Sequence, residues 1–130
     1  MKALDIMTSN VFTLREDHDL NMAQVLSEGK HIRHIPVVNS AGAPVGIIAC
    51  RDVARALSNP SLTRFAPVRD VMSTDLVTTS PQTSVSELLK IMASELIAAV
   101  LLVEKGKLVG IVTERDVVHA LHEYGATLLE

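Results

Sequence analysis

Apolar and polar positions follow the same succession of patterns in both halves of this chain. In the second half, apolar side chains within residues 85–92 recur at i, i+3, i+4 and i+7, the spacing of one face of an amphipathic helix. Ser84 and Glu87 form a capping-box pattern at the start of that stripe. The first half has a weaker stripe over residues 20–26, and Gly29 is predicted to end the helix.

Two apolar runs follow each of these helices, and a glycine-containing turn joins them. The runs are Ile35–Val38 with Val45–Ile48, and Val100–Val103 with Leu108–Val112. Runs that are apolar on both faces and joined this tightly predict buried hairpin strands. Short extended pieces at Val11–Thr13 and Leu76–Thr78 precede the helices, and a second helix closes each copy. The predicted order is β-α-β-β-α, twice, which is an α/β (α+β) fold.

The chain is an internal duplication. Asp5–Thr8 aligns with Asp70–Ser73 at an offset of 65, and the seventeen-residue stretches from Gly42 and from Gly106 share nine identities. Such self-similarity indicates two copies of one structural unit. We therefore predict repeat 1 at residues 1–58, a linker at 59–67, repeat 2 at 68–125 and a C-terminal tail at 126–130.

Composition narrows the class of protein. Twelve basic and fifteen acidic residues leave a formal charge of −3, and aromatic residues make up 2% of the 130 residues. Neither a basic stripe nor a stacking platform for bases is present, so we expect no nucleic-acid partner. No apolar run approaches the ~20 residues that span a bilayer, and one cysteine suits a reducing compartment. We expect a cytoplasmic protein without a membrane partner, and no motif indicates a catalytic site.

The duplicated motifs resemble those of a tandem pair of cystathionine β-synthase (CBS) domains, the Bateman module. The resemblance rests on the runs Ile35–Val38 and Val45–Asp52, on Gly106 and 108–113, and on the openings at Asp5 and Asp70. It implies that the two copies pack as a pseudo-two-fold pair, and that pairs associate into homodimers with four copies. It also implies a non-enzymatic regulatory module whose clefts bind adenosine-containing ligands.

The sequence Thr113-Glu114-Arg115-Asp116 follows the last predicted strand and opens the last helix. The resemblance implies that Thr113 and Asp116 accept the ribose hydroxyls of such a ligand. The same pattern is also a capping box, and the two interpretations are compatible. Equivalent positions in the first copy hold Ala49 and Asp52, so that copy lacks the hydroxyl and its cleft is predicted to be degenerate.

A cluster of cations lies before the hairpin of the first copy only. Arg33 and His34 offer phosphate donors, whereas their counterparts are Ala98 and Ala99. A solvated charged face is the alternative interpretation of that cluster. The resemblance implies that these cations serve the cleft of Thr113 and Asp116, and that Thr78 contacts the ligand. The predicted ligand-binding set is Thr113, Asp116, Thr78, Arg33, His34, Ile111 and Arg115, with no metal and no catalytic residue.

Two functions remain open from the sequence. The first is a regulatory module that binds AMP, ADP or ATP and acts on an unidentified partner protein in trans. The alternative is a structural or dimerisation module with vestigial clefts. Retention of the ribose motif and the cations for one cleft favours the first function.

Overall fold

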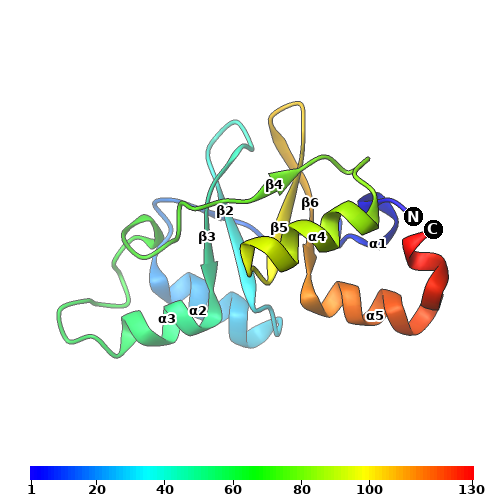
Figure 1. Ribbon diagram of the computed structural model, residues 1–130. Coiled ribbons are helices and arrows are strands. Elements are labelled where there is room, and N and C mark those ends of the chain that lie inside the picture. The colour runs from blue at the N-terminus through cyan, green and yellow to red at the C-terminus, as the bar shows by residue number, and fades with distance from the viewer. The chain divides into compact units, whose positions relative to one another are not determined.

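The structure is a computed structural model that describes all residues, 1–130. The chain forms two compact units, which Figure 1 shows by residue colour. Unit 1 contains Met1–Val11 and Val77–Glu130, and unit 2 contains Phe12–Leu76. Each unit has one three-stranded mixed sheet with helices, so the fold is the α/β fold predicted from the repeat. No helix has the length and apolar character needed to cross a lipid bilayer.

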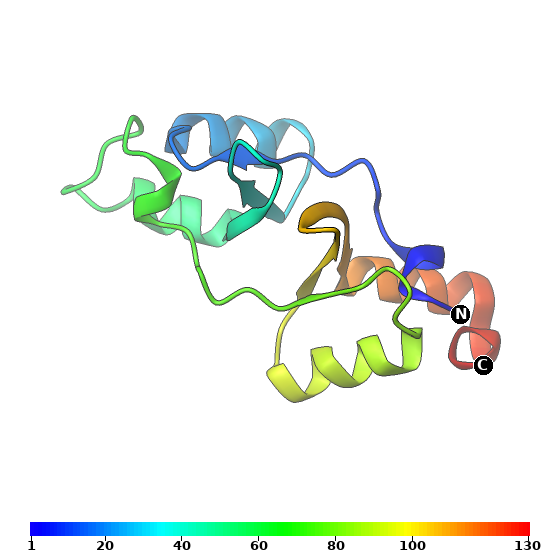
Figure 2. The ribbon, with the colours of Figure 1, turned by 90° about the horizontal axis from the view of Figure 1, so that it is seen from above.

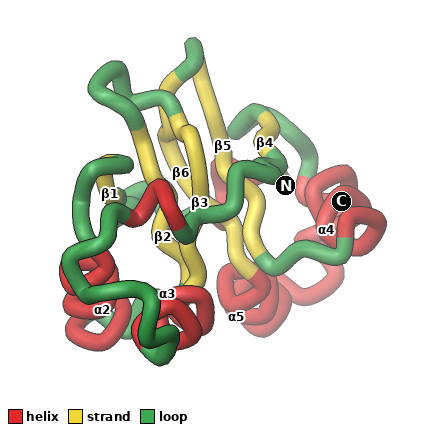
Figure 3. Tube along the Cα trace, turned by 90° about the vertical axis from the view of Figure 1, so that its left-hand side faces the viewer, coloured by secondary structure: helices red, strands yellow, loops and turns green.

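Unit 2 has a sheet of strand order β1-β2-β3. Its elements are β1 (Leu14–Arg15), α2 (Leu20–Gly29), β2 (His34–Val38), β3 (Pro44–Ala49), α3 (Cys50–Leu57) and the 3-10 turn η1 (Val68–Asp70). Strand β1 pairs parallel with β2, and β2 pairs antiparallel with β3, which confirms the predicted hairpin. Helices α2 and α3 lie side by side (Figure 3).

Unit 1 repeats this arrangement with strand order β4-β5-β6. Its elements are α1 (Ala3–Ile6), β4 (Thr78–Thr79), α4 (Val85–Glu95), β5 (Ala99–Glu104), β6 (Lys107–Thr113), α5 (Glu114–Tyr124) and the 3-10 turn η2 (Gly125–Leu129). The Ser84 side chain accepts a hydrogen bond from the Glu87 backbone N–H at 3.1 Å, as a cap at this position predicts. The two termini lie side by side in this unit (Figures 1 and 2).

Each unit has its own apolar core on the helix-covered face of its sheet. In unit 1, alternate strand residues such as Val100, Leu102 and Val112 pack with the α4 stripe of Val85, Leu88 and Met92. In unit 2, Ile35, Val37 and Ile48 pack with Leu20 and Ala23 of α2. Because successive side chains of a strand point to opposite faces, the residues between these core positions lie on the other face of each sheet.

The opening segment of each sequence repeat belongs to the unit that contains the body of the other repeat. Met7 belongs to unit 1 and packs on Gly110, whereas Met72 belongs to unit 2 and packs on Gly46. Backbone bridges hold both segments in equivalent places, between Thr8 and Ile111 in unit 1 and between Ser73 and Ile47 in unit 2. A side chain on either glycine would overlap the methionine, which would have to shift to make room.

The predicted first strand of the first copy is wrong in position. Pairing occurs at Leu14–Arg15 rather than at Val11–Thr13, and Leu14 lies opposite Val37 of β2. Leu14 is 1% exposed and Phe12 is 45% exposed, so burial of the leucine sets the register. The second copy shows a smaller difference, because β4 shares only Thr78 with the predicted Leu76–Thr78.

Candidate functional site

The N-terminus of α5 is organised around the carboxylate of Asp116. Thr113 is the N-cap, with extended backbone angles, and its hydroxyl accepts from the Asp116 N–H at 3.4 Å. In return, Asp116 Oδ2 accepts from the Thr113 backbone N–H at 2.8 Å and from the Thr113 hydroxyl at 3.1 Å. This reciprocal arrangement is a capping box, as the spacing predicted. It fixes a half-buried carboxylate directly after a buried strand.

A residue that the sequence interpretation missed also binds this carboxylate. The Thr8 hydroxyl donates to Asp116 Oδ1 at 2.9 Å, so Asp116 accepts three hydrogen bonds in all. Two backbone hydrogen bonds hold Thr8 in place: its N–H donates to the Ile111 carbonyl at 2.9 Å, and its carbonyl accepts from the Ile111 N–H at 3.0 Å. The only signal in the sequence was the hydroxyl that both repeat openings share, at Thr8 and Ser73.

The sheet of unit 1 places three predicted site residues on one face. Thr78 lies opposite Leu101, and Leu101 lies opposite Ile111, so these side chains form one row across the sheet. Thr113 follows Ile111 by two positions and therefore lies on the same face, which is the face opposite the core. Arg115 is exposed on the first turn of α5. Four of the seven predicted residues thus lie at or beside the carboxyl end of β6, whereas Thr78 belongs to the edge strand β4.

The equivalent position in unit 2 has a simpler arrangement. Ala49 is the N-cap of α3 and makes no side-chain capping bond. Asp52 Oδ2 accepts one hydrogen bond, from the Ala49 backbone N–H at 3.1 Å. Ser73, the counterpart of Thr8, accepts from the Asp75 N–H at 3.3 Å and makes no bond to Asp52. Asp52 therefore lacks two of the three partners that hold Asp116.

The predicted phosphate donors lie in unit 2. Arg33 is exposed, and its carbonyl accepts from the Cys50 N–H at 2.8 Å. His34 begins β2 and lies opposite Ala49, on the face of the sheet away from the core. The equivalent pair in unit 1 is Ala99 opposite Thr113. At this register position, unit 1 therefore has the hydroxyl of Thr113 without an imidazole, and unit 2 has the imidazole of His34 without a hydroxyl.

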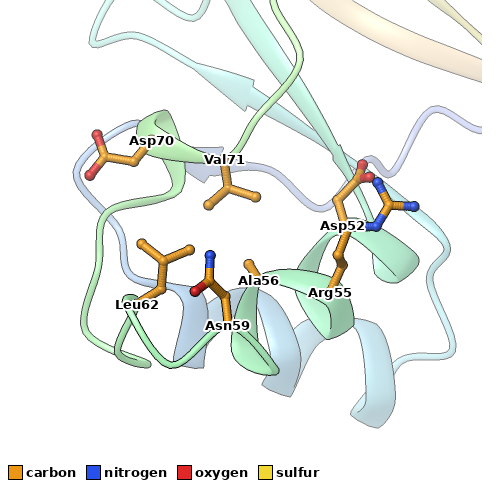
Figure 4. Close-up of a pocket in the computed structure, with 7 residues that line it drawn as sticks. All are labelled: Asp52, Arg55, Ala56, Asn59, Leu62, Asp70 and Val71. Carbon is orange, nitrogen blue, oxygen red and sulfur yellow. The ribbon is translucent and has the colours of Figure 1, made fainter.

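A pocket of about 290 Å³ lies in unit 2 (Figure 4). Its lining residues come from α3, from the loop after it, from η1 and from the residue that follows η1; they are Asp52, Arg55, Ala56, Asn59, Leu62, Asp70 and Val71. Two carboxylates and one guanidinium give its wall a net negative charge. Because like charges repel, this wall suits a phosphate group poorly. No group of three or more metal-ligating side chains occurs anywhere in the chain.

Comparison with known proteins assigns the fold to a family. The model of the CBS domain matches residues 3–59 and 68–123. The chain therefore belongs to the CBS domain family and contains two tandem copies, a CBS pair or Bateman module. It is similar to the crystal structure of AcuB from Vibrio cholerae, with 35% identity and a TM-score of 0.87 over 95% of this chain and 91% of that one.

Curated relatives include both short and long proteins. The CBS domain-containing protein YhcV of Bacillus subtilis is 32% identical over 86% of this chain and 79% of its own length. A homoserine O-acetyltransferase of Methanohalophilus mahii is 31% identical over 90% of this chain, which spans only 23% of that enzyme. The similarity to such enzymes is therefore restricted to their CBS regions.

Two structures with the same fold were solved with ligands. The CBS pair of protein MJ0100, in complex with 5′-methylthioadenosine and S-adenosyl-L-methionine, is 24% identical, with a TM-score of 0.83 over 95% of this chain and 97% of that one. CBSX2 in complex with AMP is 21% identical, with a TM-score of 0.83 over 94% of this chain and 96% of that one. At these identities the likeness establishes the fold alone.

Proposed function

We propose that this CBS pair is a non-catalytic regulatory module that binds AMP, ADP or ATP. Thr113 and Asp116 contact the ribose, Arg33 and His34 supply phosphate donors, and Thr78, Ile111 and Arg115 complete the ligand-binding set. The observation that carries the proposal is the capping box at Asp116, which combines a fixed carboxylate, a hydroxyl and the N-terminus of a helix. The adenosine ligands of MJ0100 and CBSX2 support the choice of ligand class.

The helix end adds a physical reason to expect a polar or anionic ligand. The first backbone N–H groups of an α-helix have no partners within the helix, and its dipole favours negative charge. Arg33 presents a planar set of donors that matches phosphate oxygens. A positive ligand such as S-adenosyl-L-methionine would meet these groups unfavourably, so we propose that phosphorylated adenosine binds more tightly.

We propose that the nucleotide signal is passed to a partner protein in trans, and that the module acts in the cytoplasm. The reducing conditions of that compartment suit the single cysteine, Cys50, which is exposed and unpaired. Such a partner must distinguish the nucleotide-bound module from the free one.

A second candidate function, dimerisation, has its own supporting observation. Helix α5 presents Val118, Leu121 and Tyr124 to solvent with exposed fractions of 66%, 48% and 39%. Apolar side chains gathered on one exposed helix indicate an interaction surface. We propose that a second copy of the chain covers this surface and that the module is a homodimer.

Thermal unfolding in the presence of AMP, ADP, ATP, S-adenosyl-L-methionine and adenosine tests the nucleotide proposal. A ligand that binds only the folded state at about a hundred times its Kd adds about 2.7 kcal/mol of stability. We expect the three nucleotides to raise the melting temperature and S-adenosyl-L-methionine to raise it less. If none of the five ligands changes it at millimolar concentration, the nucleotide proposal is wrong and the dimerisation function takes its place.

A further inference from the structure

We propose that Thr8 is a positioning residue that limits nucleotide affinity, because its hydroxyl occupies an acceptor site on Asp116 that the ribose needs. This inference rests on the proposed function and assigns a role to a residue outside the predicted ligand-binding set. The 2.9 Å hydrogen bond from Thr8 Oγ1 to Asp116 Oδ1 carries it.

The Asp116 carboxylate can accept only a limited number of hydrogen bonds. An ionised carboxylate has about four lone-pair positions for hydrogen bonds, two on each oxygen. Thr113 fills both positions on Oδ2 through its N–H and its hydroxyl, and Thr8 fills one on Oδ1. One position remains, whereas the 2′- and 3′-hydroxyls of a ribose together need two. A ribose that donates both hydroxyls to Asp116 must therefore displace one existing donor.

Thr8 is the donor that can withdraw most readily. The Thr113 hydroxyl has two functions in the cap, since it donates to Asp116 Oδ2 and accepts from the Asp116 N–H. The Thr8 hydroxyl makes a single side-chain bond, and the residue is exposed, so water can replace Asp116 as its acceptor. Rotation about χ1 suffices, because both backbone bonds between Thr8 and Ile111 stay in place.

Unit 2 provides an internal comparison. Ser73 occupies the place of Thr8 and has a hydroxyl, but within unit 2 this hydroxyl accepts from the Asp75 N–H, and the hydrogen bond to Asp52 is made to Oδ2 by the Ala49 N–H. The occupied acceptor is therefore specific to the unit that has the complete Thr113–Asp116 motif. It is not a general property of the repeat, and Ser73 is a matched control position.

We expect the affinity of the parent protein to depend little on whether the ribose has one hydroxyl or two. A nucleotide that lacks one hydroxyl needs only the acceptor position that is already open. The parent protein should therefore bind 2′-deoxy-AMP almost as well as AMP. Once the Thr8 hydroxyl is removed, AMP gains a second acceptor and 2′-deoxy-AMP gains nothing.

Calorimetric titration of the full chain with AMP and 2′-deoxy-AMP tests this. We expect Thr8→Val to bind AMP about threefold to tenfold more tightly than the parent, the range set by the net contribution of one ordinary hydrogen bond, because the site is half-exposed. The preference for AMP over 2′-deoxy-AMP should rise by the same factor. Thr8→Ser, which keeps the hydroxyl, should behave like the parent, and Ser73→Ala should leave both affinities unchanged. Should Thr8→Val not fold, Thr8→Ala takes its place.

The outcomes separate the two proposals. Unchanged or weaker AMP binding by Thr8→Val, or an unchanged preference between the two ligands, overturns the role of Thr8 and leaves the proposed function intact. If Thr8→Val binds AMP and the parent protein does not, the Thr8 hydroxyl blocks binding completely, which supports the role of Thr8. If neither protein binds either nucleotide, the proposed function fails and the inference fails with it.

Discussion

The matched substitutions Asp116→Ala and Asp52→Ala should have different effects on the stability of the ligand-free protein. Both aspartates occupy the third position of a helix that follows a hairpin, and from the sequence alone the two changes are equivalent. In the structure, Asp116→Ala removes three hydrogen bonds, one of them from Thr8 in the N-terminal segment. Asp52→Ala removes one.

The hydrogen-bond partners of each aspartate set the expected loss in the free energy of unfolding. Loss of a carboxylate from the first turn of a helix costs about 0.5–1 kcal/mol through the cap and the helix dipole, and this is the whole cost expected for Asp52→Ala. For Asp116→Ala the Thr8 and Thr113 hydroxyls also lose their acceptor. Both are accessible enough to be rehydrated, so each adds about 0.5 kcal/mol, the lower end for one hydrogen bond. We therefore expect a loss of about 2 kcal/mol for Asp116→Ala.

Urea unfolding followed by circular dichroism measures this difference. The midpoint should fall about twice as far or more for Asp116→Ala as for Asp52→Ala, with the slope unchanged. Adding Thr8→Val to Asp116→Ala should cost little, since their shared bond is already lost. Equal midpoints for the two alanine variants would refute the reasoning from hydrogen-bond partners. In the presence of AMP, only Asp116→Ala should abolish the stabilisation by ligand.

Further predictions concern the cations, the glycines and the exposed face of α5. Arg33→Ala should weaken AMP binding by about tenfold and leave adenosine binding unchanged in calorimetry, because only the phosphate contact is lost. Gly110→Ala should lower the free energy of unfolding by about 1–3 kcal/mol, since its Cβ would lie 2.5 Å from the Met7 sulfur. The control Gly29→Ala, at the end of α2 with no atom near its Cβ, should stabilise the protein by about 0.5 kcal/mol. Light scattering should give a dimer for the parent and a monomer for Leu121→Glu.

Local signals made much of the fold predictable. The hairpin strands, the Ser84 cap and the end of α2 at Gly29 each depend on residues that are close in the sequence. The capping box at Asp116 was visible for the same reason, because Thr113 lies three positions away. Such patterns act before any tertiary contact forms, so a sequence alone specifies them.

The missed features depend on contacts across the chain. Thr8 and Asp116 are 108 residues apart, and no local pattern relates a threonine in the opening segment to a carboxylate in the last helix. The short strand β1 was misplaced because two residues carry no periodic signal, and only the burial of Leu14 against its partners sets its position. Tertiary packing decided both features.

The exchanged opening segments have a consequence for how such a chain arises. Unit 2, Phe12–Leu76, is 65 residues long, which equals the offset between the sequence repeats, yet it begins 11 residues after the start of predicted repeat 1 and ends 18 residues after the end of that repeat. The duplicated segment and the folding unit therefore have the same length but start and end at different positions in the sequence. A single ancestral copy would have had two ways to complete its unit. Its opening segment could fold back onto its own body, or it could exchange opening segments with a second chain. After gene fusion each copy completes the other, so deletion of the first copy also removes α1, Met7 and Thr8 from the unit formed by the second.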